Sequence, residues 1–436
     1  MIHLPYGKSF LEFSGDVTVI TSPFSDEKAK NPVRAEMLSG AEIVKISMEN
    51  PFGGVTLREL AKNTPDCTVI ISDHTRPVPS KDILPLMLKE LREGNPDIKI
   101  TLLVATGLHR ETTKEELREK LGDEIYHNEH IEIHDASNPD KNVRIGTLPS
   151  GAPLYIDKTA AEAGLLISEG FIEPHFFAGF SGGRKSVLPG VSGRLTVLGN
   201  HSGAFIADPH ARTGILEDNP VSRDMEAAAE MAHLRYIVNV VIDEEHRTIA
   251  AFSGESKAAH KAGCEFVKKM FLVKPGTFDI VITTNGGAPL DQNIYQCVKS
   301  MTAAESCCRN GGVIIVCAEC ADGKGGEVFY QSLKNCESAA ALYEEYCKVP
   351  QEDTIADQWQ SQILARVLKN HPVIFVTRPE LKDVIEDMKM VYAPTVQEAY
   401  EKARGLCIEA FLRGTISSLA GITTAVIPNG ISVIIE

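Results

Sequence analysis

Short apolar runs alternate with longer amphipathic stretches along the N-terminal part of the chain. Runs rich in β-branched residues predict strands at 17–20, 67–71, 98–104 and 165–168. The stretch 80–93 has helical spacing, because one stripe collects Ile83, Leu84, Met87, Leu88 and Leu91. Helices are also predicted at 56–63 and at 112–120, where Thr113 and Glu116 form a capping box. Strands separated by helices of this length predict a mostly parallel α/β sheet.

A second series of strands and helices follows. Strands are predicted at 235–243 and 247–252 and a helix at 256–271, before a linker at 273–277. Further strands are predicted at 278–283, 313–317, 373–376 and 423–427, with helices at 293–308 and 355–369. The expected fold is therefore two α/β domains with mostly parallel sheets, 1–272 and 273–436, and an active-site cleft between them.

Length and charge narrow the possible functions. The chain has 436 residues, which favours more than one core, and its net charge of -15 argues against non-specific binding of nucleic acid. No apolar run is long enough for a membrane span, and the first residues lack a signal-peptide pattern, so we expect a cytoplasmic protein. The ten cysteines are scattered, and Cys317 and Cys320 have no second Cys-x-x-Cys pair, which favours free thiols.

Polar loops rich in histidine follow three of the predicted strands. The loops at 72–77, 105–110 and 173–190 contain His74, His109 and His175 in turn. Because parallel strands end at the same edge of a sheet, we expect these loops to converge on one crevice. In the C-terminal part, the helix after the strand-end loop 285–292 carries Gln296 and Lys299, which point the same way at i, i+3 spacing.

The stretch 173–201 has the most chemical content. It contains His175 and His201, a glycine-rich turn, and the cations Arg184 and Lys185. Free amides in such a turn bind anions, and histidine transfers protons or binds metal. The segment 179–186 is close to a P-loop, but Arg184 replaces the glycine that this motif needs before lysine. A nucleotide hydrolase or kinase, and a glycine-rich turn that packs two elements, both remain alternatives.

Five motifs together resemble the nickel-pincer-dependent lactate racemase family of 2-hydroxyacid racemases and epimerases. They are Ser-Asp-His-Thr-Arg-Pro at 72–77, Thr-Gly-Leu-His-Arg at 106–110, the segment 173–185, His201, and Tyr-Gln-Cys-Val-Lys at 295–299. The resemblance covers essentially the whole chain. It implies a nickel pincer nucleotide attached to Lys185 through a thioamide, with His201 as the protein ligand to nickel and Asp73 near the ribose. Enzymes that synthesise this cofactor are then expected partners.

The resemblance also implies the roles around the substrate. His109 and His175 would be the acid/base pair. The substrate, a small 2-hydroxyacid with lactate as the family default, would be held by Arg76, Gln296 and Lys299, with Tyr295 beside them. We further infer a phosphate site formed by Ser181, Gly182, Gly183 and Arg184.

These roles agree with the chemistry of the reaction. The Cα–H of lactate is a poor acid, so its transfer as hydride, with formation of a 2-keto acid, avoids a dianion. One histidine takes the hydroxyl proton, and the other returns a proton after the keto acid has turned over. A nickel-nucleotide carrier that binds the cofactor without turnover is the non-enzymatic alternative.

Overall fold

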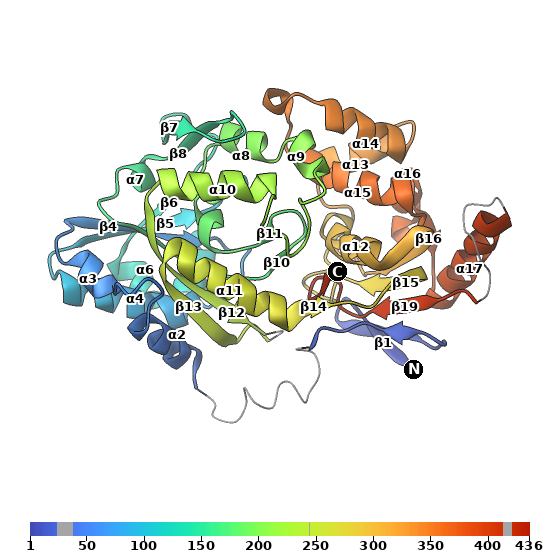
Figure 1. The fold of residues 1–436 in the computed structure, drawn as a ribbon, viewed down its shortest axis with the longest axis horizontal. Coiled ribbons are helices and arrows are strands. Elements are labelled where there is room, and N and C mark those ends of the chain that lie inside the picture. Colours follow the sequence, from blue (N-terminus) through green and yellow to red (C-terminus); the bar gives the residue numbers. More distant parts are fainter. Residues whose placement is uncertain (24–37, 244, 413–420) are drawn as a thin grey trace. The chain divides into compact units, whose positions relative to one another are not determined.

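The computed structural model describes residues 1–23, 38–243, 245–412 and 421–436 (Figure 1). The chain forms two compact units. Unit 1 takes in the described residues of Met1–Lys30, Ser202–Ala207 and Met270–Glu436, and unit 2 those of Asn31–His201 and Asp208–Lys269. Each unit contains a six-stranded sheet with helices, so the predicted fold class is confirmed.

Unit 2 is built on a sheet with the strand order β13-β12-β9-β4-β5-β6. All neighbours in it run parallel except the edge pair of β12 and β13. Its strands are β4 (Asp66–Ser72), β5 (Lys99–Ala105), β6 (His130–Ile133), β9 (Leu166–Phe171), β12 (Leu234–Ile242) and β13 (Thr248–Glu255). Two antiparallel pairs join β7 (Asn142–Thr147) to β8 (Pro153–Asp157) and β10 (Pro174–His175) to β11 (Gly179–Phe180).

Successive side chains of these strands point to opposite faces of the sheet. Cys67, Val69 and Ile71 of β4 share one apolar core with side chains from the helices that cover that face. These helices are α2 (Gly40–Glu49), α3 (Leu57–Ala61), α4 (Ser80–Gly94), α5 (Lys114–Leu121) and α6 (Asp123–Asn128). The remaining helices of unit 2 are α7 (Lys158–Ala161), η2 (Gly183–Ser186), α8 (Arg194–Asn200), α10 (Pro220–Met231) and α11 (Ser256–Phe271).

Unit 1 has the strand order β18-β17-β16-β15-β19-β3, with every neighbour parallel. Its strands are β3 (Thr18–Val19), β15 (Phe278–Thr284), β16 (Cys308–Cys317), β17 (Val373–Val376), β18 (Val391–Ala393) and β19 (Thr424–Ile427). Its helices are α9 (Gly203–Ala207), α12 (Ile294–Cys307), α13 (Glu327–Asn335), α14 (Ala339–Lys348), η3 (Gln351–Asp353), α15 (Gln358–Asn370), η4 (Pro379–Leu381), α16 (Lys382–Asp387) and α17 (Val396–Leu412).

The units differ from the predicted division at 272/273. The hairpin of β1 (Ile2–Tyr6) and β2 (Ser9–Phe13) places Leu4 and Phe13 in the apolar core of unit 1. The predicted strand at 17–20 forms as β3, but its partner is β19, about four hundred residues away along the chain. In α9, the carbonyl of Gly203 accepts a hydrogen bond of 2.7 Å from Gln362 Nε2. Pairing over such separations leaves no local signal.

Most predicted elements agree closely with the structure. The helix predicted at 256–271 is α11, and the capping box of Thr113 and Glu116 begins α5. The linker predicted at 273–277 is wrong at its start, because Val273 belongs to β14 (Leu272–Val273), which pairs with β20 (Ile434–Ile435). Parallel pairing with the end of the chain turns an apparent connector into a strand.

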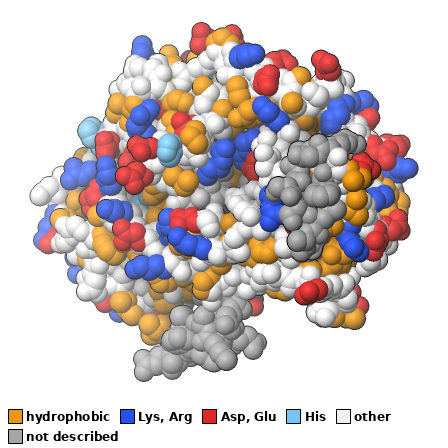
Figure 2. Space-filling view, turned by 45° about the vertical axis from the view of Figure 1, so that its right-hand side comes forward, with side chains coloured by type: hydrophobic (Ala, Val, Ile, Leu, Met, Phe, Trp, Pro, Cys, Tyr) orange, Lys and Arg blue, Asp and Glu red, His pale blue; other side chains and the backbone are white. Residues whose placement is uncertain are grey.

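The visible surface carries charges of both signs. In the face shown in Figure 2, acidic and basic side chains are interspersed, and the described residues there form no continuous basic band. On this face neither sign of charge dominates.

Candidate active site

Three loops of unit 2 leave the same edge of its sheet. β4 lies between β5 and β9 and runs parallel to both, so the loops after Ser72, Ala105 and Phe171 begin side by side. A hydrogen bond of 2.9 Å from the Gly107 amide to the Gly190 carbonyl joins the second loop to the third. The predicted convergence of these strand ends is confirmed.

Asp73 and His109 form a hydrogen-bonded pair at this edge. Asp73 Oδ2 lies 2.7 Å from His109 Nδ1, and Asp73 Oδ1 accepts hydrogen bonds from the amide and hydroxyl of Thr75. Burial alone would raise the pKa of Asp73, but the His109 hydrogen bond and charge, together with Thr75 and Arg76, hold it below its usual value. Because a carboxylate only accepts, Nδ1 carries the proton in the neutral form of His109, and Nε2 then has the lone pair.

His175 has the opposite arrangement. It lies in the β10–β11 hairpin, where the Ala178 amide donates to His175 Nδ1 over 3.2 Å. Its Nε2 lies 3.1 Å from Lys185 Nζ, so the Ala178 amide and the lysine amine contact the two ring nitrogens. At Nδ1, His109 thus faces an acceptor and His175 faces a donor.

His201 is held in the form that binds metal. Its Nδ1 donates to the Val197 carbonyl over 3.0 Å, which fixes the tautomer and leaves the lone pair on Nε2. Burial, followed by the nearby Lys185 charge, lowers the pKa of His201 to about 3, so the ring is neutral at physiological pH. The described residues contain no cluster of three or more histidine, cysteine or carboxylate side chains suited to a metal ion.

One aromatic ring links these groups. The buried ring of Phe177 makes edge contacts with His175 at 4.5 Å and with His201 at 5.1 Å between ring centroids. Lys185 Nζ lies 5.7 Å from the centre of the same ring. Sequence reasoning did not single out Phe177, because an apolar residue in a loop resembles any other core residue.

The polar groups of the predicted phosphate site at 181–184 bond to other parts of unit 2. The Ser181 hydroxyl donates to the Phe171 carbonyl and accepts from the Glu173 amide, and the Gly183 amide donates to Asn239 Oδ1 over 2.7 Å. Arg184 is only 4% exposed and donates to the Ala178 carbonyl and the Ser222 hydroxyl. These polar groups hold the chain together and are not directed at a ligand, which also disfavours the P-loop alternative.

The glycines of this turn have a packing role. Gly182 and Gly183 have φ angles of +75° and +53°, and a Cβ atom at Gly182 would lie 2.6 Å from Asn239 Oδ1. Asn239 is a polar residue within the apolar part of β12, and that was the one sequence signal for its role. The structure therefore matches the alternative in which the turn packs two elements.

His260, behind this turn, gives a prediction for the cofactor-free protein. Burial, followed by the Arg184 charge, lowers the pKa of His260 to about 3, whereas an unfolded histidine titrates near 6.5. Below the unfolded pKa only the unfolded chain takes up the proton, so this histidine lowers stability as pH falls towards 3. The unfolding free energy of wild type should fall between pH 7 and pH 5. In His260→Gln this fall should be smaller by about 2 kcal/mol.

Urea unfolding at the two pH values measures this difference. The exposed His127 provides a control, because His127→Gln should follow the wild-type pH dependence. An equal acid-induced loss in wild type and His260→Gln would contradict the prediction.

The predicted substrate residues of the C-terminal part lie together on α12 of unit 1. Gln296 and Lys299 are partly buried in its first two turns, and Asn293 caps the helix by accepting from the Gln296 amide. The Tyr295 hydroxyl donates to Asp357 Oδ1 over 2.9 Å, and its pKa is raised by burial and then by the Asp357 charge. Cys297 faces inwards, with its Sγ 3.9 Å from Cys320 Sγ. Arg76, the other predicted substrate residue, belongs to unit 2.

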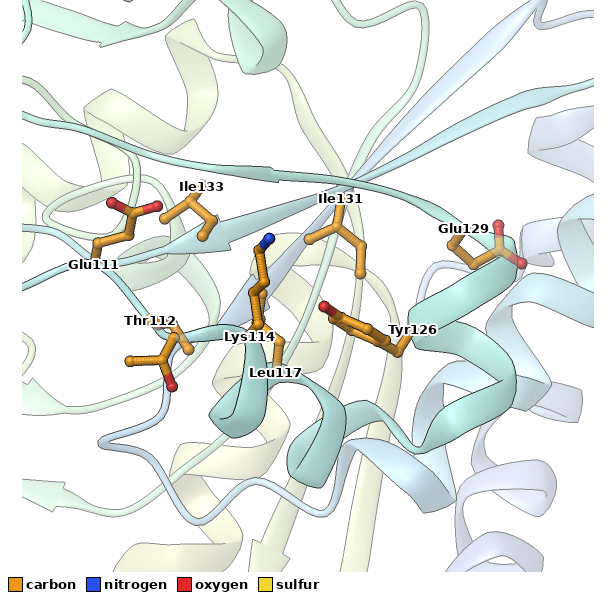
Figure 3. Close-up of a pocket in the computed structure, with 9 residues that line it drawn as sticks. Glu111, Thr112, Lys114, Leu117, Tyr126, Glu129, Ile131 and Ile133 are labelled. Atoms are coloured by element: carbon orange, nitrogen blue, oxygen red, sulfur yellow. The ribbon is translucent and has the colours of Figure 1, made fainter.

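Unit 2 also has a cavity of about 520 Å³, away from the predicted site residues (Figure 3). Ile131 and Ile133 extend into it from β6 and Tyr126 from α6, while Glu111 and Lys114 flank it near the start of α5. None of the predicted site residues lines it.

Comparison with known proteins gives the family. A model of the lactate racemase N-terminal domain matches residues 16–214, and a model of the lactate racemase C-terminal domain matches residues 273–435. The chain belongs to the lactate racemase family. The lactate racemases of Thermoanaerobacterium thermosaccharolyticum and Lactiplantibacillus plantarum are each 46% identical to it over 441 aligned positions, which cover 100% of this chain and 99% of theirs.

Solved structures agree with this membership. The lactate racemase apoprotein from T. thermosaccharolyticum superposes with a TM-score of 0.92 at 45% identity, covering 100% of this chain and 99% of that one. A Thermotoga maritima protein shares the fold alone, with a TM-score of 0.63 at 18% identity over 92% of this chain and all of that one. Among the described residues, no helix combines the length and apolar character needed to cross a membrane.

Proposed function

We propose that this protein is a 2-hydroxyacid racemase, with lactate as its first candidate substrate, and that it uses a nickel pincer nucleotide tethered to Lys185. The observation that carries the proposal is the difference between the Nδ1 partners of His109 and His175. His109 Nδ1 lies against the Asp73 carboxylate and His175 Nδ1 accepts from the Ala178 amide, at neighbouring strand-end loops of a chain 46% identical to two lactate racemases. A reaction that interconverts mirror-image substrates needs one proton acceptor and one donor.

The side chains present fit this cofactor. His201 offers a neutral imidazole with its lone pair on Nε2, and Lys185 has an amine beside His175 and Phe177. When bound, the cofactor would supply the hydride acceptor for the substrate Cα–H. Lys185 would hold it covalently and His201 would be the protein ligand to its nickel. Because the phosphate site at 181–184 is not retained, we assign no residues to the nucleotide phosphate.

The protein's own groups would handle the protons and the carboxylate. His109 Nε2 would accept the proton of a substrate hydroxyl on its side. The Asp73 carboxylate, which binds the Nδ1–H, would stabilise the resulting imidazolium. His175, as an imidazolium, would donate a proton to the substrate oxygen on the other side and return to the neutral ring, and the roles reverse for the opposite enantiomer. Arg76, Gln296 and Lys299 would hold the carboxylate while the rest of the substrate turns, and Tyr295 would line the pocket.

The test is a racemisation assay on protein produced together with the cofactor-synthesis enzymes, the partners that this function requires. We expect L-lactate and D-lactate each to approach an equal mixture, measured by chiral chromatography, with nickel and added mass at Lys185. Cofactor attachment without turnover of any 2-hydroxyacid in a panel would show a carrier. Lack of both nickel and added mass would remove the cofactor from the proposal. We place the enzyme in the cytoplasm, where fractionation can test it.

A further inference from the structure

A buried carboxylate lies beneath the loop that carries Asp73 and Arg76. Glu169, in β9, is 2% exposed and points to the sheet face covered by α4 and α5, as Ile167 and Phe171 do. Its Oε1 accepts a hydrogen bond of 2.8 Å from the Ser80 hydroxyl and longer ones of 3.4 Å from the amide and hydroxyl of Ser72. A single carboxylate oxygen therefore bonds to both ends of the segment from Ser72 to Ser80.

A lysine from α5 holds the middle of the same segment. Lys120 Nζ donates to the backbone carbonyl of Arg76 over 3.2 Å. Burial raises the pKa of Glu169, and the positive charge of Lys120 is the largest effect in the opposite direction. Burial lowers the pKa of Lys120, and the negative charges of Glu169 and then Asp73 act in the opposite direction. The charge of each group therefore opposes the effect of burial on the other.

We propose that Lys120 and Glu169 are positioning residues for Arg76. Together they fix the Ser72–Ser80 segment at its start, middle and end, so that the exposed Arg76 side chain starts from a defined backbone position. A guanidinium that binds a carboxylate through two hydrogen bonds loses much of its binding free energy when it is displaced by about 1 Å. The Lys120 ammonium itself is directed at a backbone carbonyl. The inference rests on the proposed function, in which Arg76 binds the substrate carboxylate.

The first test compares three variants of the cofactor-loaded enzyme. Lys120→Met should raise the KM for lactate about tenfold and leave kcat within about twofold, because substrate binding is affected and proton transfer is not. Lys120→Arg keeps a cationic donor and should restore KM to within about threefold of wild type. Lys114→Met, an exposed lysine on the same helix, should have wild-type KM and kcat.

A second variant separates positioning from general stability. Glu169→Gln keeps an oxygen for Ser72 and Ser80 but leaves Lys120 without its compensating charge, so KM should rise as in Lys120→Met. Melting temperature and mass at Lys185 are measured for each variant. A lowered melting temperature with unchanged KM would overturn the inference, as would a fall in kcat alone. An inactive wild-type enzyme would instead contradict the proposed function, so the two failures are distinguishable.

Discussion

Lys185→Ala is expected to abolish racemisation, with a loss of at least about 10³-fold relative to the loaded wild type. The proposal gives Lys185 the covalent attachment of the group that accepts hydride, a step for which no protein side chain can substitute. Intact mass should show no cofactor on the variant after production with the synthesis enzymes. Chiral chromatography should show the lactate enantiomers unchanged.

Two controls make this result specific. Lys185→Arg retains a cation near His175 and Phe177 but cannot form the thioamide, so it should be as inactive as Lys185→Ala. Lys158→Ala removes an exposed lysine of the same unit and should retain wild-type activity and added mass. Full racemisation by Lys185→Ala would remove the covalent tether from the mechanism.

Replacing either histidine of the proposed acid/base pair should reduce activity while the cofactor stays attached. We expect His109→Asn and His175→Asn each to lose about 10²- to 10⁴-fold in kcat, the usual contribution of a positioned acid or base. The two lactate enantiomers have equal free energy, so kcat/KM must fall equally in both directions. Initial rates from each pure enantiomer, normalised to the mass-detected cofactor, measure this.

Asp73 provides a graded comparison. Asp73→Asn removes the carboxylate that holds His109 Nδ1–H but keeps the shape of the side chain. We expect a loss of about tenfold or more in kcat, smaller than for His109→Asn. A His109→Asn enzyme with wild-type kcat would exclude His109 from proton transfer, whatever the result at Asp73.

Local pattern determined the fold class because strands and helices of an α/β unit leave their period in the sequence. The run at 67–71 became β4 and the stretch at 80–93 became α4, and parallel pairing then brought the loops after β4, β5 and β9 to one edge. The positions of His109 and His175 at strand ends followed from the same rules.

Long-range pairing was invisible to these rules. The first strands of the chain joined unit 1, although the sequence predicted one domain for 1–272. Arg184 looked like an anion ligand because arginine beside glycines often is. It is buried with its donors on the Ala178 carbonyl and the Ser222 hydroxyl, and Ser222 comes from a helix later in the chain.

The sequence by itself therefore determined two α/β units, and it placed the candidate histidines and lysine in loops at one edge of a sheet. Only the tertiary structure decided which group contacts Nδ1 of each histidine. These are Asp73 for His109, Ala178 for His175 and Val197 for His201. The reason is physical. Secondary structure follows from neighbours in sequence, whereas the proton on a histidine depends on the donor or acceptor that folding places beside each ring nitrogen.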